Sequence, residues 1–151
     1  MAAVPRALRS SLPDGFFHVV SRGVFGARIY SDARDGRRFV ELLEQSAKDH
    51  RWDCYAYCLM STHYHLVVES RRKDLSAGMQ VLNVRHALGF NKRHGRYGAL
   101  FAERFSARLV EHEQYLYEAC AYVVLNPVRA GLCAAAEDWP WSYSRFGLSA
   151  A

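Results

Sequence analysis

The stretch Trp52–Ser70, with the sequence WDCYAYCLMSTHYHLVVES, decides the fold of this 151-residue chain. It holds two runs of aromatic and aliphatic residues, and the short polar pair Ser61-Thr62 separates them. Runs of this length and composition on either side of a turn signal are typical of β-strands. We therefore expect strands over 52–60 and 63–70.

Outward from this stretch, the chain alternates between strand and helix patterns. The elements expected, in chain order, are a strand over 16–22, a helix from Asp32 or Asp35 to about His50, the two strands above, a helix over 75–92, a strand over 105–110, and a helix that begins near 111–113 and stops at Asn126-Pro127. Gly78 and Gly89 weaken the prediction of the second helix. This order predicts an α+β, ferredoxin-like (split βαβ) fold, in which helices pack on an antiparallel sheet.

Length and composition predict one domain over residues 1–151, with a flexible N-terminus over about 1–13 and a C-terminal extension over about 133–151. Half of the residues are hydrophobic and 23% are charged, as in soluble globular proteins. The apolar runs are too short for a membrane span, and the N-terminus lacks the apolar core of a signal peptide. We therefore expect no membrane association and a location in the bacterial cytoplasm, with the protein nucleoid-associated when it is on DNA.

The chain is basic, with a formal net charge of +5 and an isoelectric point of about 9.2. Of its 20 basic residues three are lysine, so 17 are arginine. Guanidinium groups bind phosphates and stack on bases, which favours a nucleic-acid partner, but a GC-rich genome also favours arginine codons. The four cysteines match no common zinc template, so we expect reduced thiols.

The most specific local pattern is His63-Tyr64-His65 in the second of the two quoted strands. Side chains alternate across a strand, so the two histidines project from one face and Tyr64 from the other. Two imidazoles at this separation can bind one divalent cation. The same short pattern also occurs as ordinary half-buried strand histidines, and the residues alone leave both interpretations open.

Glu118, Tyr122 and Asn126 are spaced by four and share one face of the last predicted helix. If this face meets the histidines, Asn126 completes a three-ligand metal site and Tyr122 presents its hydroxyl to a polarised phosphate. A phenol with a normal pKa of about 10 needs a cation or base to become a nucleophile. The alternative is that Tyr122 packs in the core and Asn126 only ends the helix.

A third pattern is the basic and aromatic segment from Arg85 to Arg108. Clustered guanidinium groups with interleaved aromatics fit a groove that holds phosphates and stacks unpaired bases, although a solvated basic loop has the same composition.

Taken together, these blocks resemble the single-tyrosine HUH transposases, and most closely the REP-associated tyrosine transposases. The resemblance extends from about Phe17 to Tyr143. Its blocks are His18-Val19-Val20-Ser21-Arg22-Gly23, Tyr57-Cys58-Leu59-Met60, His63-Tyr64-His65, Asn91-Lys92-Arg93-His94-Gly95, Leu100-Phe101, Arg104-Phe105, Tyr122, Asn126-Pro127-Val128-Arg129-Ala130-Gly131-Leu132 and Trp139-Pro140-Trp141-Ser142.

The resemblance implies an HUH endonuclease fold in which His63, His65 and Asn126 hold Mg²⁺ or Mn²⁺. It implies that Tyr122 is the nucleophile, which forms a 5′-phosphotyrosine link and leaves a free 3′-hydroxyl. The implied partner is single-stranded DNA with hairpin structure, and family members act as monomers or homodimers. We expect DNA contacts at Arg22, Asn91, Lys92, Arg93, Arg96, Arg104 and Arg108.

The chain departs from the family pattern at three places. Ser61-Thr62 replaces the usual Pro-Asn, His86 and Gly89 replace common aromatics, and the loop Gly23–Gly26 lacks the usual polar residues. These departures leave the implied metal ligands and nucleophile intact, but they affect positions that are expected to take part in DNA recognition. Two further functions stay open on sequence alone: a hairpin-binding protein that does not cleave, and an RNA-binding ferredoxin-like module. A zinc hydrolase is disfavoured because the general-base constellation is missing.

Overall fold

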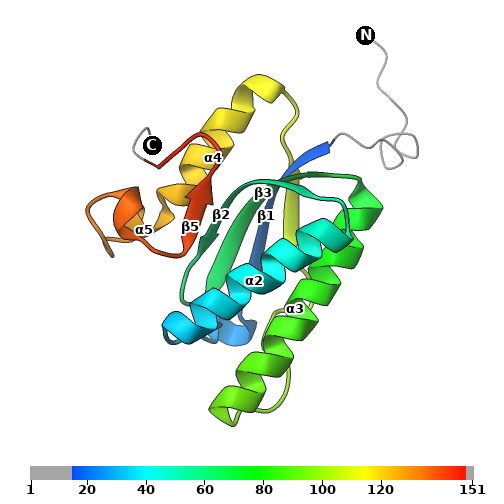
Figure 1. Cartoon of the computed structure of the whole chain (residues 1–151), viewed down its shortest axis with the longest axis vertical. Helices are drawn as coiled ribbons and strands as arrows, with labels where there is room; N and C mark the ends of the chain where they lie inside the picture. Colours follow the sequence, from blue (N-terminus) through cyan, green and yellow to red (C-terminus); the bar gives the residue numbers. More distant parts are fainter. Residues whose placement is uncertain (1–14, 149–151) are drawn as a thin grey trace.

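The computed structural model describes residues 15–148 and contains a five-stranded antiparallel sheet with helices on both faces (Figure 1). The strands are β1 (Gly15–Arg22), β2 (Asp53–Leu59), β3 (His63–Ser70), β4 (Ser106–Leu109) and β5 (Ser142–Ser144). The helices are α2 (Ala33–Asp49), α3 (Arg72–His94), α4 (Leu116–Val124) and α5 (Asn126–Arg129), with 3-10 turns η1 (Val24–Gly26), η2 (Glu113–Tyr115) and η3 (Ala136–Asp138). The sheet order β4-β1-β3-β2-β5 confirms the predicted α+β, split βαβ fold. The predicted flexible segment 1–13 lies outside the described residues.

Strand β3 lies at the centre of the sheet, and its alternating side chains build two cores. Tyr64, Leu66 and Val68 are completely buried under α2 and α3, where they meet residues such as Phe39. Val67 points to the other face and packs against α4. Because α4 covers this second face, the histidines that alternate with Tyr64 lie under α4 and not in the main core.

Helix α3 is longer than the sequence predicts, because it starts at Arg72 and ends at His94. Gly78, which lowered the predicted helix propensity, allows close packing. A Cβ atom at this position would lie 2.3 Å from the Trp52 ring. The helix therefore tolerates the glycine because the Trp52 side chain fills the space beside it.

The C-terminal part of the chain contributes a strand that the sequence interpretation does not contain. Residues 142–144 form β5, which pairs with β2 at the edge of the sheet. Trp139 fixes this segment, because its indole N–H donates to the Leu59 carbonyl at 2.9 Å, and the Leu59 N–H donates to the Trp141 carbonyl at 2.8 Å. Residues 133–148 are therefore part of the folded domain.

The last predicted helix is divided in the structure. Helix α4 ends at Val124, close to the predicted stop, but the chain becomes helical again in α5, where Pro127 occupies the first turn. Among the residues from 15 to 148, no helix combines the length and apolar character that crossing a membrane requires. The four cysteines are free thiols, as expected.

Candidate active site

The candidate site lies between α4 and the sheet face formed by β1, β3 and β4. In the antiparallel pairing of β1 with β3, Arg22 is opposite His63 and Val20 is opposite His65. Paired residues share a face, so His18, two residues from Val20, also lies on this face. The result is an open cleft of about 400 Å³, lined by His18, Val20, Arg22, His65, Ser106, Arg108, Ala119 and Tyr122.

His63 and His65 project from the same face, as the sequence predicts, and their ring centroids are 5.2 Å apart. The Nδ1 atom of His65 lies 3.0 Å from Nε2 of His18, and Nδ1 of His63 lies 3.2 Å from the Thr62 hydroxyl oxygen. When each Nδ1 donates its hydrogen to this partner, both Nε2 atoms keep a free lone pair. Hydrogen-bonded Nδ1 with free Nε2 is the usual arrangement of metal-binding histidines.

All three histidines at this cleft are held in the neutral form. Burial lowers the pKa of His65 to about 3, and the neighbouring His18 and His63 contribute to the shift. Burial, followed by the charge of Arg108, lowers the pKa of His18, and burial together with Arg22 lowers that of His63. A neutral imidazole is the form that binds metal ions, so these lowered pKa values favour the protonation state that a metal site requires.

Helix α4 brings Tyr122 to the histidines. Leu116, Cys120 and Val123 form the apolar stripe that packs on the sheet, so Tyr122 lies at the margin of this stripe and is 50% exposed. Its ring centroid is 6.2 Å from that of His65 and 5.6 Å from that of His18.

Two other tyrosines near α4 contact different aromatic residues. The Tyr117 ring packs against Phe146. Tyr115 contacts the His112 ring in the turn before the helix and lines a neighbouring cleft that His18 also lines. Of these three tyrosines, Tyr122 is the one in ring contact with the strand histidines. Its position agrees with the predicted stripe, although Glu118 is solvent-exposed and Ala119 lines the cleft in its place.

Asn126 lies at the junction of α4 and α5, one turn after Tyr122. Its side-chain N–H₂ donates to the carbonyls of Val123 at 3.0 Å and Tyr122 at 3.3 Å. Because both amide hydrogens are directed at the helix backbone, the carbonyl oxygen Oδ1 is left as the acceptor that a cation can use. Two imidazole nitrogens and one amide oxygen are a donor set that divalent metals accept, so these residues fit the implied ion.

Two residues of the site are absent from the sequence-based assignments. His18 is hydrogen-bonded to His65, and Arg129 stacks on Tyr122, with its Cζ atom 3.9 Å from the phenol ring centroid. Arg129 also donates to the Tyr122 carbonyl at 2.7 Å. The β1–β3 register and the break between α4 and α5 create these contacts, and neither is visible in a local pattern.

The predicted DNA-contact residues divide into two groups. Arg22 and Arg108 line the cleft beside the histidines, and Arg104 is exposed in the loop before β4. The other predicted contacts belong to the C-terminal end of α3 and the loop after it, so they lie with the helices that cover the opposite face of the sheet (Figure 1).

In this second group, several polar groups are engaged within the protein. Asn91 donates to the Gly98 carbonyl and accepts from Arg96, which closes the loop after α3. Lys92 is exposed and lines a second, larger cleft between α2 and α3, together with Arg34 and Arg37.

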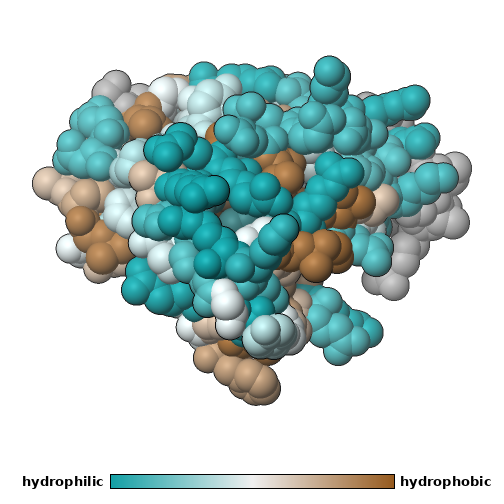
Figure 2. Space-filling view, turned by 60° about the horizontal axis from the view of Figure 1, so that its bottom comes forward, coloured by the Kyte–Doolittle hydropathy of each residue, from teal (hydrophilic) through white to brown (hydrophobic). Residues whose placement is uncertain are grey.

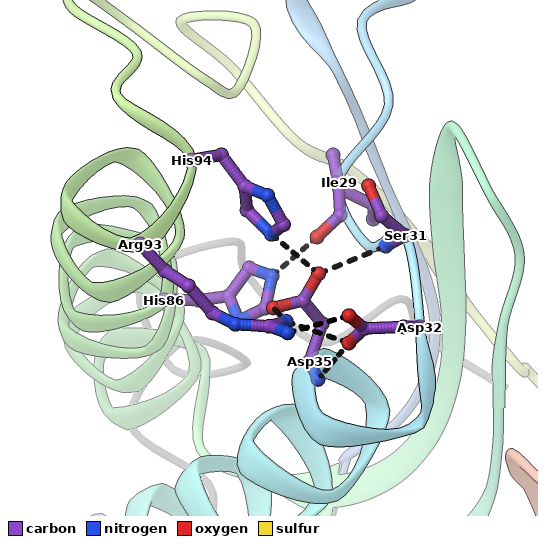
Figure 3. A network of polar contacts seen from close by, with 7 residues as sticks. All are labelled: Ile29, Ser31, Asp32, Asp35, His86, Arg93 and His94. Carbon is purple, nitrogen blue, oxygen red and sulfur yellow. Dashed lines mark hydrogen bonds and ion pairs between the residues drawn. The ribbon is translucent and has the colours of Figure 1, made fainter.

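Arg93 belongs to a network that joins the N-terminus of α2 to the C-terminus of α3 (Figure 3). Asp35 lies at its centre and is only 3% exposed, and it accepts hydrogen bonds from the Ser31 N–H, Arg93 and His94. Asp32 binds the same guanidinium and caps α2. Burial alone raises the pKa of Asp35, but these hydrogen bonds outweigh it and the pKa is lowered. Arg93 therefore has a structural role in this fold.

Across residues 15–148, no three His, Cys, Asp or Glu side chains gather so that they hold a metal ion by themselves. The candidate metal site depends on an asparagine oxygen as its third protein ligand.

Comparison with known families decides what kind of protein carries this site. A family model described as IS200-like transposase matches residues 16–125. The chain belongs to the IS200-like transposase family. This match confirms the resemblance found in the sequence, and it includes the two histidines and Tyr122 but ends one residue before Asn126.

One curated relative of this transposase family member has low sequence identity to it. A protein named as a REP-associated tyrosine transposase from Haemophilus influenzae is 22% identical over 115 residues, which are 69% of this chain and 65% of the relative. The chain thus spans about two thirds of the length of that relative.

Two solved structures share the fold at 14% sequence identity. A REP-associated tyrosine transposase bound to a REP hairpin superposes with a TM-score of 0.72 over 94% of this chain and 82% of that chain. A transposase from Deinococcus radiodurans gives a TM-score of 0.54 over 79% and 98%, respectively.

Proposed function

We propose that this transposase family member is a metal-dependent endonuclease and strand transferase that cuts and rejoins single-stranded DNA beside hairpins. The observation that carries the proposal is the position of Tyr122 next to His18 and His65, with the Nε2 atoms of His63 and His65 free for a ligand. A phenol beside neutral imidazoles, with the Asn126 amide one helical turn further along the chain, supports the chemistry of a single-tyrosine nuclease.

In the proposed reaction, the Tyr122 hydroxyl loses its proton to solvent and its oxygen attacks a DNA phosphorus atom. The new bond joins Tyr122 Oη to phosphorus, and the bond from phosphorus to the 3′ oxygen breaks. The leaving oxygen takes a proton and becomes a free 3′-hydroxyl, while the 5′-phosphate stays on the tyrosine. Attack by a second 3′-hydroxyl reverses these steps and joins two strands, so the reaction needs no nucleotide cofactor.

His63, His65 and Asn126 would hold Mg²⁺ or Mn²⁺, which supplies positive charge to polarise the phosphoryl oxygens. His18 fixes the ring orientation of His65 through their hydrogen bond. Arg129 holds the Tyr122 ring through its cation–π contact. These contacts reduce the freedom of the nucleophile and of one ligand before the substrate binds.

The cleft also suits a single strand of DNA. Arg22 and Arg108 place two guanidinium groups beside the histidines. A neighbouring cleft of about 390 Å³ shares His18, Arg108 and Ala119 with the active-site cleft, so the two form one groove along α4. The structural neighbour bound to a REP hairpin supports hairpin DNA as the partner.

The test is incubation of the protein with single-stranded hairpin oligonucleotides labelled at both ends, with Mg²⁺, Mn²⁺ or EDTA. We expect a nick with a free 3′-hydroxyl in either metal, no nick in EDTA, and strong loss of nicking in His63→Ala with hairpin binding retained. Binding without a nick across a varied hairpin library would contradict the proposal and favour a binding protein. Nicking that persists in EDTA would contradict the metal site alone.

A further inference from the structure

The loop between β1 and α2 presents one aromatic side chain entirely to solvent. Phe25 has a relative exposure of 103%, so the residue is fully open to solvent in the part of the chain that the structure describes. Its backbone has φ 50° and ψ 36°, and Gly26 after it has φ 74°. Two consecutive left-handed residues turn the chain sharply, and Phe25 stands at the tip of this turn.

Backbone hydrogen bonds fix this loop to two neighbouring segments of the chain. The Gly23 N–H donates to the Thr62 carbonyl and the Val24 N–H to the Leu100 carbonyl, each at 2.8 Å. A Cβ atom on Gly23 would lie 2.0 Å from the Ala27 carbonyl oxygen, so the two arms of the loop are in close contact. The position of Phe25 is therefore imposed by a rigid backbone.

This arrangement has a free-energy cost that no contact within the described chain offsets. A bulky residue is strained in the left-handed region, where glycine, asparagine or aspartate fit more easily. The exposed phenyl ring gains nothing from burial that would offset this strain. Strained residues of this kind concentrate at ligand-binding sites, where the benefit comes from the bound molecule.

The surroundings of Phe25 indicate what this molecule is. The described stretch 15–31 contains Arg22 and Arg28 and no acidic side chain. Tyr97, which is 93% exposed, is in the loop that leads to Leu100 and thus to the backbone of the Phe25 loop. Arg22 is paired with His63, so Phe25 stands beyond the end of the sheet where the proposed metal ligand lies.

The figures show the position of this loop. Turn η1 is the short blue segment at the lower end of the sheet in Figure 1, on the same side as the C-terminus of α3. Figure 2 turns this lower end toward the viewer and shows a largely hydrophilic surface in which hydrophobic residues are scattered. This polar surface suits a hydrated, charged partner with flat apolar bases better than a lipid bilayer or an apolar protein face.

We propose that Phe25 is a stacking platform for one unpaired DNA base next to the cut site. The phenyl ring takes the face of the base, while Arg22 and Arg28 neutralise the adjoining phosphates. This inference rests on the proposed function, because it requires a single strand that leaves the cleft past His63. It adds a contact that supports binding of the flank without touching the reacting phosphate.

The test measures the affinity of wild type and Phe25→Asn for a hairpin with single-stranded flanks, in EDTA to prevent nicking. Asparagine adopts the left-handed conformation readily, so we expect an unchanged or higher melting temperature. We expect affinity to fall roughly 5- to 100-fold, the range that loss of one base–aromatic stack gives. Phe25→Trp should restore it, and Leu88→Ala, which removes an exposed leucine of α3, should match wild type.

Abasic substitutions along the flank identify the stacked base. At one flank position, loss of the base should lower the DNA affinity of wild type as much as the Phe25→Asn substitution does. The same abasic DNA should not lower the affinity of Phe25→Asn any further. Equal abasic penalties in both proteins would overturn the stacking site alone. No preference of wild type for flanked over blunt hairpins would overturn this inference, whereas the proposed function itself fails only if wild type does not nick these hairpins in Mg²⁺ or Mn²⁺. A change in oligomeric state with unchanged DNA affinity would assign Phe25 to contact with a second copy instead.

Discussion

Replacement of Arg129 by alanine should slow DNA cleavage without a matching loss of DNA binding. The guanidinium lies 3.9 Å from the Tyr122 ring centroid and donates to the Tyr122 carbonyl at 2.7 Å. A cation–π contact at an exposed ring contributes about 0.5–1 kcal/mol. A hydrogen bond from a charged donor at a partly exposed site adds about 1 kcal/mol. Together, about 1.5–2 kcal/mol holds Tyr122 in its present orientation.

If all of this free energy serves to orient the nucleophile, Arg129→Ala lowers the cleavage rate roughly 10- to 30-fold, because about 1.4 kcal/mol corresponds to a factor of ten. Arg129→Lys keeps the charge but loses the planar stack, so its rate should lie between those of wild type and Arg129→Ala. Lys73→Ala removes one exposed positive charge of α3 and serves as the control for net charge.

The assay is single-turnover nicking at saturating hairpin DNA, with the dissociation constant measured separately in EDTA. We expect a slower cleavage rate in Arg129→Ala, with DNA affinity within about threefold of wild type. A wild-type rate in Arg129→Ala would refute the orienting role. An unchanged rate at saturation with much weaker binding would show that Arg129 contacts a phosphate instead.

Two further predictions concern the stability of the folded chain. Asp35→Asn should lower the free energy of unfolding by about 2–3 kcal/mol, because Asp35 is 3% exposed and binds the Arg93 guanidinium and the His94 ring. Urea denaturation measures this change, and wild-type stability of the variant would contradict the structural role of the network. The free energy of unfolding of the metal-free wild type should fall by on the order of 2 kcal/mol between pH 7.5 and pH 5 because of His65 alone. The pKa of His65 is 6.5 in the unfolded chain and about 3 in the folded chain, so in this window the unfolded chain takes up a proton that the folded chain does not. The free energy of unfolding should therefore rise with pH across this window, and it should rise less in His65→Gln. Parallel curves of unfolding free energy against pH for the two proteins would exclude the burial of a neutral His65.

The sheet and its two layers of helices are predictable from the sequence because each main element has a clear period. Alternation in His63–Ser70 gives both the strand and the two faces on which Tyr64 and His65 lie. The three-residue strand β5 has no such period. It exists because Tyr143 and its neighbours pair with β2, and this pairing depends on the position of a strand far away in the chain.

Helix propensity alone also underestimates the stability of α3. Gly78 lowers the expected stability of the helix, yet the Trp52 ring occupies the space where a Cβ atom would lie. Tertiary packing outweighs local preference here, as it commonly does.

The candidate site is predictable where one element carries several of its residues and hidden where the contacts cross between elements. His63 and His65 are neighbours on one strand, and Tyr122 and Asn126 are one helical turn apart. His18 depends on the register of β1 against β3, and Arg129 on the break between α4 and α5. Family resemblance brings these blocks together in order, but it assigns no contact to either residue.

The most direct test of the central claim is peptide mass spectrometry of the covalent product formed with a cleavable hairpin in Mn²⁺. The account predicts a 5′-phosphonucleotide attached to the peptide that contains Tyr122, and no covalent product or nick in Tyr122→Phe, which should still bind the hairpin. An adduct on Tyr115 or Tyr117, or normal nicking by Tyr122→Phe, would contradict the assignment of Tyr122 as the nucleophile.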